Sequence, residues 1–212
     1  MKVGPGLPVD GKNRSAHNGA MTRYPESGGP IRRHIPEGDN LPRLVCDTCG
    51  VIRYDNPKIG VGSVASLNDG RILLCRRAIE PQSGFWTIPA GYMEENETAE
   101  AGALREAREE AGAALEIEGL LAVYNVPRIS QVQLIFRARM ADELLAIGPE
   151  SLEARFFTWD EIPWDALAFP SVIWALSHHR AAQGRPLGAP YGNPTGQTSD
   201  FARGHAAPRP GD

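Results

Sequence analysis

Residues 91–113 read GYMEENETAEAGALREAREEAGA, and this stretch decides how the chain folds. Residues 97–111 are rich in alanine, glutamate, arginine and leucine, which favour helices, and Gly112 follows as a typical helix stop. At about 100° per residue, Ala107 and Ala111 share one small apolar stripe that can pack on a sheet. The stretch therefore predicts an amphipathic helix over residues 97–111.

The side of this helix opposite the apolar stripe carries Glu106, Glu109 and Glu110. These carboxylates fall within about 100° of arc, with neighbours roughly 5–6 Å apart. The crowding raises the free energy of the folded chain unless a cation binds, and the predicted helix contains no lysine. Oxygen ligands grouped in this way suit Mg²⁺ or Mn²⁺ better than zinc or copper. An ordinary solvated acidic face is the alternative interpretation.

The segments around the helix predict a mixed domain of α/β or α+β class. They lack the regular strand–helix alternation of a doubly wound sheet. Five strands and a second helix are expected: strands at 59–67 and 71–76 joined by the turn Asn68-Asp69-Gly70, strands at 114–124, 131–140 and 154–158, and a helix at 171–182.

Composition bounds the class of protein. The chain has 212 residues, of which 42% are hydrophobic and 23% charged, as in an average soluble domain. It has no apolar run of about 18 residues and no signal peptide, so we expect a cytoplasmic protein without a membrane partner. The net charge of −4 argues against a nucleic-acid partner. Residues 1–30 and 185–212, rich in glycine and proline, are expected to be disordered tails.

The motif within residues 91–113 resembles the Nudix box, G-x5-E-x7-R-E-U-x-E-E-x-G-U, in which U is aliphatic. Ala107 and Ala113 occupy the two aliphatic positions. Every fixed position matches: Gly91, Glu97, Arg105, Glu106, Glu109, Glu110 and Gly112. The resemblance implies an α/β/α sandwich with a mixed sheet over residues 59–184. It also implies an enzyme that hydrolyses the diphosphate bond of a nucleoside diphosphate linked to another moiety.

The same resemblance implies roles for individual residues. Arg105 would hold Glu106 or Glu97 in place by a charge-assisted hydrogen bond. Divalent Mg²⁺ or Mn²⁺ would be the cofactor, with these ligands implied: the carboxylates of Glu106, Glu109 and Glu110 and the carbonyl oxygen of Ala90.

The general base stays open between Glu106 and a glutamate on a later loop, Glu150 or Glu153. A carboxylate bound to a metal ion is a poor base, because the cation lowers its proton affinity. A loop glutamate is therefore preferred. Glu153 is placed ahead of Glu150, because it lies beside the strand predicted at 154–158.

Segments outside the box resemble the FAD and ADP-ribose pyrophosphohydrolases of plants and their bacterial relatives. The main ones are Asn56-Pro57-Lys58, Pro127-Arg128-Ile129 with Gln131, Pro149-Glu150-Ser151 and Trp159-Asp160-Glu161-Ile162-Pro163. The products would be AMP plus FMN or ribose 5-phosphate. As substrate-binding residues we expect Phe85, Trp86 and Tyr124 beneath a ring system and Arg128 at a phosphate or terminal ribose.

Other functions are kept as alternatives. The NADH-pyrophosphatase branch carries Ser-Gln-Pro-Trp-Pro-Phe-Pro after its box, whereas residues 124–131 read YNVPRISQ, which disfavours NADH. A nucleotide-sugar substrate stays open. An RNA 5′-end pyrophosphohydrolase would need a basic channel, which an acidic domain does not predict. A non-catalytic ligand-sensing regulator is disfavoured by the complete box, and a homodimer stays open.

The run Cys46-Asp47-Thr48-Cys49-Gly50 resembles the second half of the small zinc ribbon that precedes some Nudix domains. We assign residues 31–58 to this segment. A structural zinc site needs four ligands, but Pro25 and Gly28 stand where the first pair of cysteines would be. Cys46 and Cys49 are then the only candidate zinc ligands with the right spacing. We therefore expect a degenerate ribbon without structural Zn²⁺.

Overall fold

The computed structural model describes residues 31–198, which divide into two units, 31–55 and 56–198. The boundary lies close to the one expected after residue 58, and the predicted tail 1–30 lies outside the described residues. The N-terminal unit is a three-stranded antiparallel sheet of β1 (Ile31–His34), β2 (Arg43–Cys46) and β3 (Ile52–Arg53), in that order.

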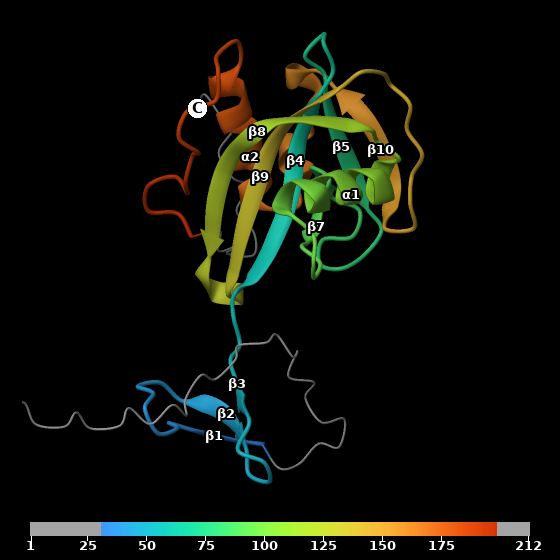
Figure 1. The fold of residues 1–212 in the computed structure, drawn as a ribbon. Helices are drawn as coiled ribbons and strands as arrows, with labels where there is room; N and C mark the ends of the chain where they lie inside the picture. The colour runs from blue at the N-terminus through green and yellow to red at the C-terminus, as the bar shows by residue number, and fades with distance from the viewer. Residues whose placement is uncertain (1–30, 199–212) are drawn as a thin grey trace, which may run out of the picture. The chain divides into compact units, whose positions relative to one another are not determined.

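The larger unit is built on a seven-stranded sheet (Figure 1). Its main path runs β10-β5-β4-β9-β8, while β6 pairs with β5 and β7 pairs with β4. The strands are β4 (Lys58–Ser66), β5 (Ile72–Arg77), β6 (Trp86–Thr87), β7 (Ala90–Tyr92), β8 (Leu115–Val126), β9 (Gln131–Met140) and β10 (Ser151–Phe157). The helices are α1 (Ala99–Ala111), α2 (Pro170–Ala182) and the short 3₁₀ turns η1 (Pro127–Ile129), η2 (Trp159–Glu161) and η3 (Trp164–Ala166).

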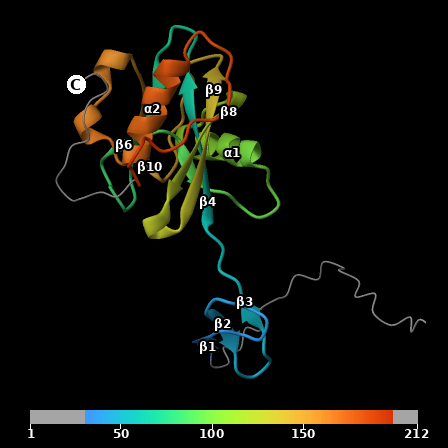
Figure 2. The same ribbon diagram turned by 90° about the vertical axis from the view of Figure 1, so that its left-hand side faces the viewer.

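The sheet is mixed, because β4 and β9 run parallel while the other pairs are antiparallel. Helices α1 and α2 lie on its two sides (Figure 2). Apolar side chains fill both layers: Ala107 of α1 packs with Leu73, and Leu176 of α2 packs in a separate cluster with Leu74. The predicted fold class, an α/β/α sandwich with a mixed sheet, is confirmed.

Each predicted strand and helix of the larger unit forms, with ends shifted by a few residues. The short strands β6 and β7 were not predicted, because two or three residues carry too little periodicity to be recognised. Among the described residues, no helix is long and apolar enough to cross a membrane.

Helix α1 begins at Ala99, later than predicted, because Thr98 is its N-cap. The Thr98 hydroxyl accepts a hydrogen bond from the Ala101 N–H at 3.1 Å. At the other end Gly112 has φ of 65°, a left-handed conformation that glycine adopts without strain, and its N–H donates to the carbonyl of Arg108.

Residues 185–198 are not a disordered tail, so that part of the prediction for 185–212 is wrong; residues 199–212 lie outside the described residues. Tyr191 pairs in parallel with Ala122 on β8, at the edge of the sheet. Tyr191 donates to the Leu121 carbonyl at 2.9 Å, and Val123 donates to the Tyr191 carbonyl at 2.8 Å. Composition could not reveal this order, because it comes from backbone groups that the edge strand leaves unpaired.

Gly112→Ala should destabilise the fold by about 2–4 kcal/mol. The left-handed backbone costs about 1–2 kcal/mol for a residue with a Cβ, and that Cβ would lie 2.7 Å from Ala146. Two controls separate these effects, because Gly70 shares the positive φ in open space and Gly188 has neither constraint. Urea unfolding should rank the losses Gly112→Ala, Gly70→Ala, Gly188→Ala, and equal losses would contradict the packing argument.

Candidate active site

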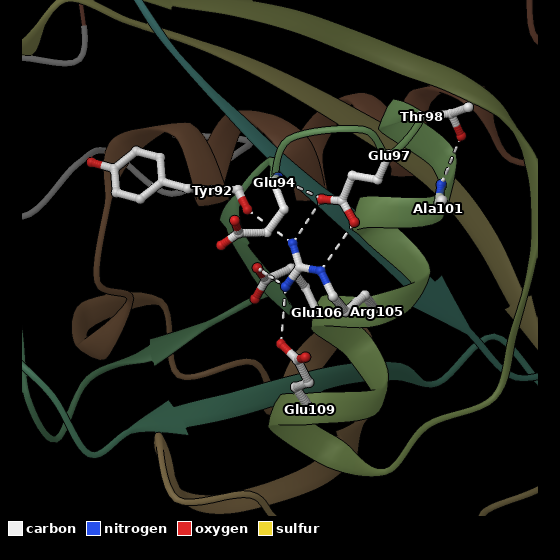
Figure 3. Close-up of polar contacts among 8 residues, drawn as sticks. All are labelled: Tyr92, Glu94, Glu97, Thr98, Ala101, Arg105, Glu106 and Glu109. Carbon is white, nitrogen blue, oxygen red and sulfur yellow. Dashed lines mark hydrogen bonds and ion pairs between the residues drawn. The ribbon is translucent and has the colours of Figure 1, made fainter. Parts of the chain in front are cut away.

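The guanidinium of Arg105, on α1, is the centre of the polar contacts of the site (Figure 3). Its Nε donates to Glu97 Oε2 at 3.1 Å, and its Nη2 donates to Glu97 Oε1 and the Tyr92 carbonyl, both at 2.9 Å. Its Nη1 donates to Glu106 Oε1 at 2.7 Å and to Glu109 Oε2 at 2.9 Å. All five N–H donors of Arg105 are thus used within the protein. Arg105 contacts both Glu97 and Glu106, between which the sequence left the choice open.

Glu97 connects the loop before α1 to the helix itself. Besides Arg105, its Oε1 accepts a hydrogen bond from the Glu94 N–H at 2.7 Å. The hydrogen bonds from Arg105, followed by the one from Glu94, lower the pKa of Glu97 to about 2. Glu97 is therefore a charged anchor that holds Arg105 in position.

Gly91 lets α1 approach β7. It lies on β7 opposite Val61 of β4, and a Cβ at Gly91 would overlap the carboxylate of Glu106. A side chain at this position would push Glu106 away from the strand. The first glycine of the box is therefore a matter of space, and it brings the strand backbone against the carboxylates of the helix.

Two of the three predicted metal ligands are buried, which the helical projection did not predict. Glu106 is 8% exposed and Glu110 is 7% exposed, whereas the Glu109 side chain is 59% exposed. The projection opposed the whole acidic side to the apolar core, but β7 covers part of that side. Glu110 Oε2 accepts a hydrogen bond from the Ala90 N–H of β7 at 3.2 Å.

Burial changes the proton affinities of these carboxyls. It raises the pKa of Glu110 to about 8; the charges of Glu106 and Glu150 also raise it, while the Ala90 N–H and the charge of Arg77 oppose the rise. Burial also raises the pKa of Glu106, against the lowering effect of Arg105. Both groups therefore need positive charge nearby to ionise fully at neutral pH.

A cavity of about 960 Å³ opens beside these carboxylates. It is lined from α1, β4, β5, β7, β9, η1, the N-terminal end of α2 and the loops between them. The charged and aromatic lining residues are Arg77, Glu80, Tyr92, Glu94, Arg105, Glu106, Glu109, Glu110, Arg128, Glu150 and Phe169. Of the predicted site residues, it brings together Ala90, Arg105, Glu106, Glu109, Glu110, Glu150 and Arg128 with Gly91.

The three aromatic residues expected beneath a substrate ring lie outside the lining of this cavity. Tyr124 is fully buried, its hydroxyl hydrogen-bonds His178 Nδ1 at 2.7 Å, and its ring packs edge-on against Trp174. Trp86 packs edge-on against Phe157, and Phe85 is 38% exposed. Sequence could not settle this, because strand alternation does not say which face meets the core.

Tyr92 and Phe169 are the aromatic residues that line the cavity instead, joined by Arg77 and by the amides of Gln131 and Gln133. They come from different strands and from the loop before α2. Gln131 belongs to a segment that sequence comparison had singled out, but Tyr92, Phe169, Arg77 and Gln133 carried no signal of their own.

The two loop glutamates differ in position. Glu150 lines the cavity, and its charge raises the pKa of both Glu106 and Glu110. Glu153 lies on β10 outside the cavity lining, 42% exposed, with Oε2 4.0 Å from Arg76 Nη1. The geometry therefore reverses the expected order and favours Glu150 as the loop base.

The donor set of this wall suits a hard divalent cation. Within residues 31–198 no three or more His, Cys, Asp or Glu side chains stand ready as a metal site, and Arg105 binds Glu106 and Glu109. Glu110 is nevertheless a buried carboxylate whose direct partner is one backbone N–H. Uncompensated buried oxygens of this kind fit Mg²⁺ or Mn²⁺.

In the N-terminal unit, the turn from Cys46 to Cys49 is closed by backbone hydrogen bonds. Gly50 N–H donates to the Cys46 carbonyl at 2.8 Å, and Cys46 N–H donates to the Val51 carbonyl at 2.9 Å. Hydrogen bonds from the backbone of Cys49 and Thr48 lower the pKa of the Cys46 thiol. The turn thus has the form of a zinc knuckle, while Pro25 and Gly28 lie outside the described residues.

Comparison with known families identifies the chain. The NUDIX domain model matches residues 56–175, and a zinc-ribbon model described as "Nudix N-terminal" matches residues 25–55. The first match covers more than half of the chain, so the chain belongs to the Nudix family of hydrolases. The family predicted from the box, and the ribbon segment before it, are confirmed.

Individual relatives add detail. An ADP-ribose pyrophosphatase of Methanocaldococcus jannaschii is 31% identical over 57% of this chain and 73% of its own length. The NAD-capped RNA hydrolase NudC of Stutzerimonas stutzeri is 31% identical over 64% of this chain and 48% of its own length, so the chain spans about half of that relative. A NUDIX hydrolase structure from Nitrosomonas europaea is 44% identical with a TM-score of 0.74, covering 80% of this chain and 97% of that one.

Glu110→Gln should stabilise the metal-free protein at alkaline pH. Because folding raises the pKa of Glu110 to about 8, the folded state keeps a proton that the unfolded state loses above about pH 4.5. Wild-type stability should therefore fall relative to Glu110→Gln between about pH 4.5 and 8, by at most about 1.4 kcal/mol per pH unit. Urea unfolding of both proteins in EDTA across this range measures the difference. Parallel pH profiles would contradict the assignment.

Metal analysis of protein prepared without chelator should find well under one zinc per chain. Two thiolates, those of Cys46 and Cys49, are too few for a structural site, which needs four ligands. Cys46→Ser should then leave the metal content unchanged. A stoichiometric zinc that is lost in Cys46→Ser would show that other residues complete the site.

Proposed function

We propose that this chain hydrolyses the diphosphate bond of ADP-ribose or FAD, giving AMP plus ribose 5-phosphate or FMN. The observation that carries the proposal is the wall of α1 carboxylates, Glu106, Glu109 and Glu110, held by Arg105 inside a cavity of about 960 Å³. That volume is at the upper end of the range for small-molecule sites, which suits a substrate with two organic halves.

The reaction breaks one phosphorus–oxygen bond. Water attacks a phosphorus, the bridging oxygen leaves with the other half of the substrate, and each product is a phosphate monoester. Divalent metal ions, when bound to the α1 carboxylates, would neutralise the diphosphate and make the attacking water more acidic. Arg105 orients Glu106 and Glu109, and Glu150 is placed to accept the proton of the water.

Two substrate assignments compete. The relative named ADP-ribose pyrophosphatase, and the segments that resemble FAD and ADP-ribose pyrophosphohydrolases, support the leading one. The relative named NAD-capped RNA hydrolase, together with the ribbon segment at residues 25–55, supports NADH or an NAD-capped end as the second. Nucleotide sugars and a non-catalytic sensing role rank below these.

The deciding assay incubates the purified chain and Mg²⁺ or Mn²⁺ with ADP-ribose, FAD, NADH, a nucleotide sugar and NAD-capped RNA. The proposal expects the highest kcat/KM for ADP-ribose or FAD, with AMP identified among the products. A preference for NADH or NAD-capped RNA would transfer the assignment to the second candidate. No turnover of any substrate would favour the sensing role.

Glu109→Gln and Glu110→Gln should each lower kcat by at least about 100-fold. Removing one charge from the metal-binding wall removes several kcal/mol of transition-state stabilisation. Glu100→Gln is the matched control, because Glu100 is exposed on the same helix and lies outside the cavity lining. Near-normal turnover of both variants at saturating metal would show that these residues are not the ligands.

The identity of the base is tested by Glu150→Gln and Glu153→Gln under saturating Mg²⁺. Loss of a general base typically lowers kcat 10²- to 10⁴-fold, and we expect this for Glu150→Gln without a change in metal affinity. Glu153→Gln should change kcat less than about threefold, since Glu153 lies outside the cavity lining. The reverse result would restore the order expected from the sequence, and two neutral variants would return the role to Glu106.

A further inference from the structure

Arg77 is an arginine of the cavity that the activity described above does not use. It is the last residue of β5 and lines the cavity together with Phe169 and Pro81. Its Nε donates to the Pro81 carbonyl at 2.9 Å, and its guanidinium carbon lies 5.3 Å from the centre of the Phe169 ring. One hydrogen bond and one cation–π contact therefore orient the guanidinium plane.

The donors of Arg77 distinguish it from Arg105. Arg105 spends all five N–H groups on protein oxygens. Arg77 spends its Nε–H on Pro81, and within residues 31–198 its two Nη groups have no hydrogen-bond acceptor. Arg77 thus keeps four N–H donors beside a cavity, which is the planar fork that binds phosphate oxygens in pairs.

The charge of Arg77 acts on the same carboxylates that form the proposed metal wall. Burial raises the pKa of Glu110, and the charge of Arg77 is among the effects that oppose the rise. Four lining carboxylates, those of Glu106, Glu109, Glu110 and Glu150, would repel a diphosphate. Positive charge with unused donors is therefore needed to hold an anion at this place.

We propose that Arg77 is a substrate-binding residue that holds a phosphate of the nucleoside diphosphate through its two Nη groups. The inference rests on the proposed function and extends it to a residue outside the Nudix box. It assigns Pro81 and Phe169 as the groups that pre-orient Arg77, so the substrate does not have to order this side chain on binding.

The neighbouring Arg76 provides a matched control. It lies on the same strand, and its Nε donates to a loop carbonyl, that of Gly84, at the same 2.9 Å. Its side chain is 45% exposed and lies near Glu153, outside the cavity lining. Loss of either arginine removes one charge and one loop contact, but only loss of Arg77 removes donors from the cavity.

The test is calorimetric titration with ADP and with adenosine in Mg²⁺ for the wild type, Arg77→Gln and Arg76→Gln. We expect Arg77→Gln to raise the Kd of ADP about 10- to 100-fold, as for a lost hydrogen bond to a charged group, and to leave adenosine binding unchanged. Arg76→Gln should bind both probes as the wild type does. Urea unfolding confirms that the variants are folded.

Three results would overturn the proposal. One is an unchanged Kd of ADP in Arg77→Gln, and another is an equal loss of ADP and adenosine affinity, which would show a structural role. The third is an equal effect of Arg76→Gln. Because these are binding measurements, they are independent of hydrolysis: a chain that binds ADP through Arg77 but cleaves no substrate would refute the proposed function alone.

Discussion

The site depends on one guanidinium that binds three carboxylates and a strand carbonyl. Arg105 joins Glu97 before the helix, Glu106 and Glu109 on the helix, and the carbonyl of Tyr92 on β7. Without this positive charge the acidic residues of α1 would repel one another and the strand would lose a contact to the helix. A single residue thus orders the loop, the helix and the strand that form the acidic wall of the cavity.

The acidic wall combines burial with incomplete charge compensation. Glu106 and Glu110 are nearly inaccessible, and β7 supplies Glu110 with one backbone N–H. Burying carboxylates in this way costs stability in the absence of a cation and creates affinity for one. The same packing that forms the hydrophobic layer under α1 therefore prepares an oxygen-rich surface for a divalent ion and a diphosphate. Arg77 adds positive charge from β5, a different strand.

Prediction from sequence succeeded where the chemistry is local and failed where segments distant in the chain meet. The helix and its glycine stop, the turn at Asn68-Asp69-Gly70 and the family all follow from short stretches whose spacing is decisive. The proposed aromatic platform did not follow. Tyr124 packs inward and hydrogen-bonds His178, while Tyr92 and Phe169 line the cavity from separate parts of the chain. A strand pattern shows that two faces exist, but the neighbouring strands and helices decide which face meets the ligand.

The sequence by itself determined the family, the fold class and the identity of the α1 carboxylates, because these depend on residue types at fixed spacing along one helix. Only the tertiary structure decided that Glu106 and Glu110 are buried, that Glu150 lies in the cavity and Glu153 outside it, and that residues 185–198 pair with the edge of the sheet. The physical reason is that burial, charge coupling and strand pairing depend on residues far apart in the chain, which no local spacing encodes.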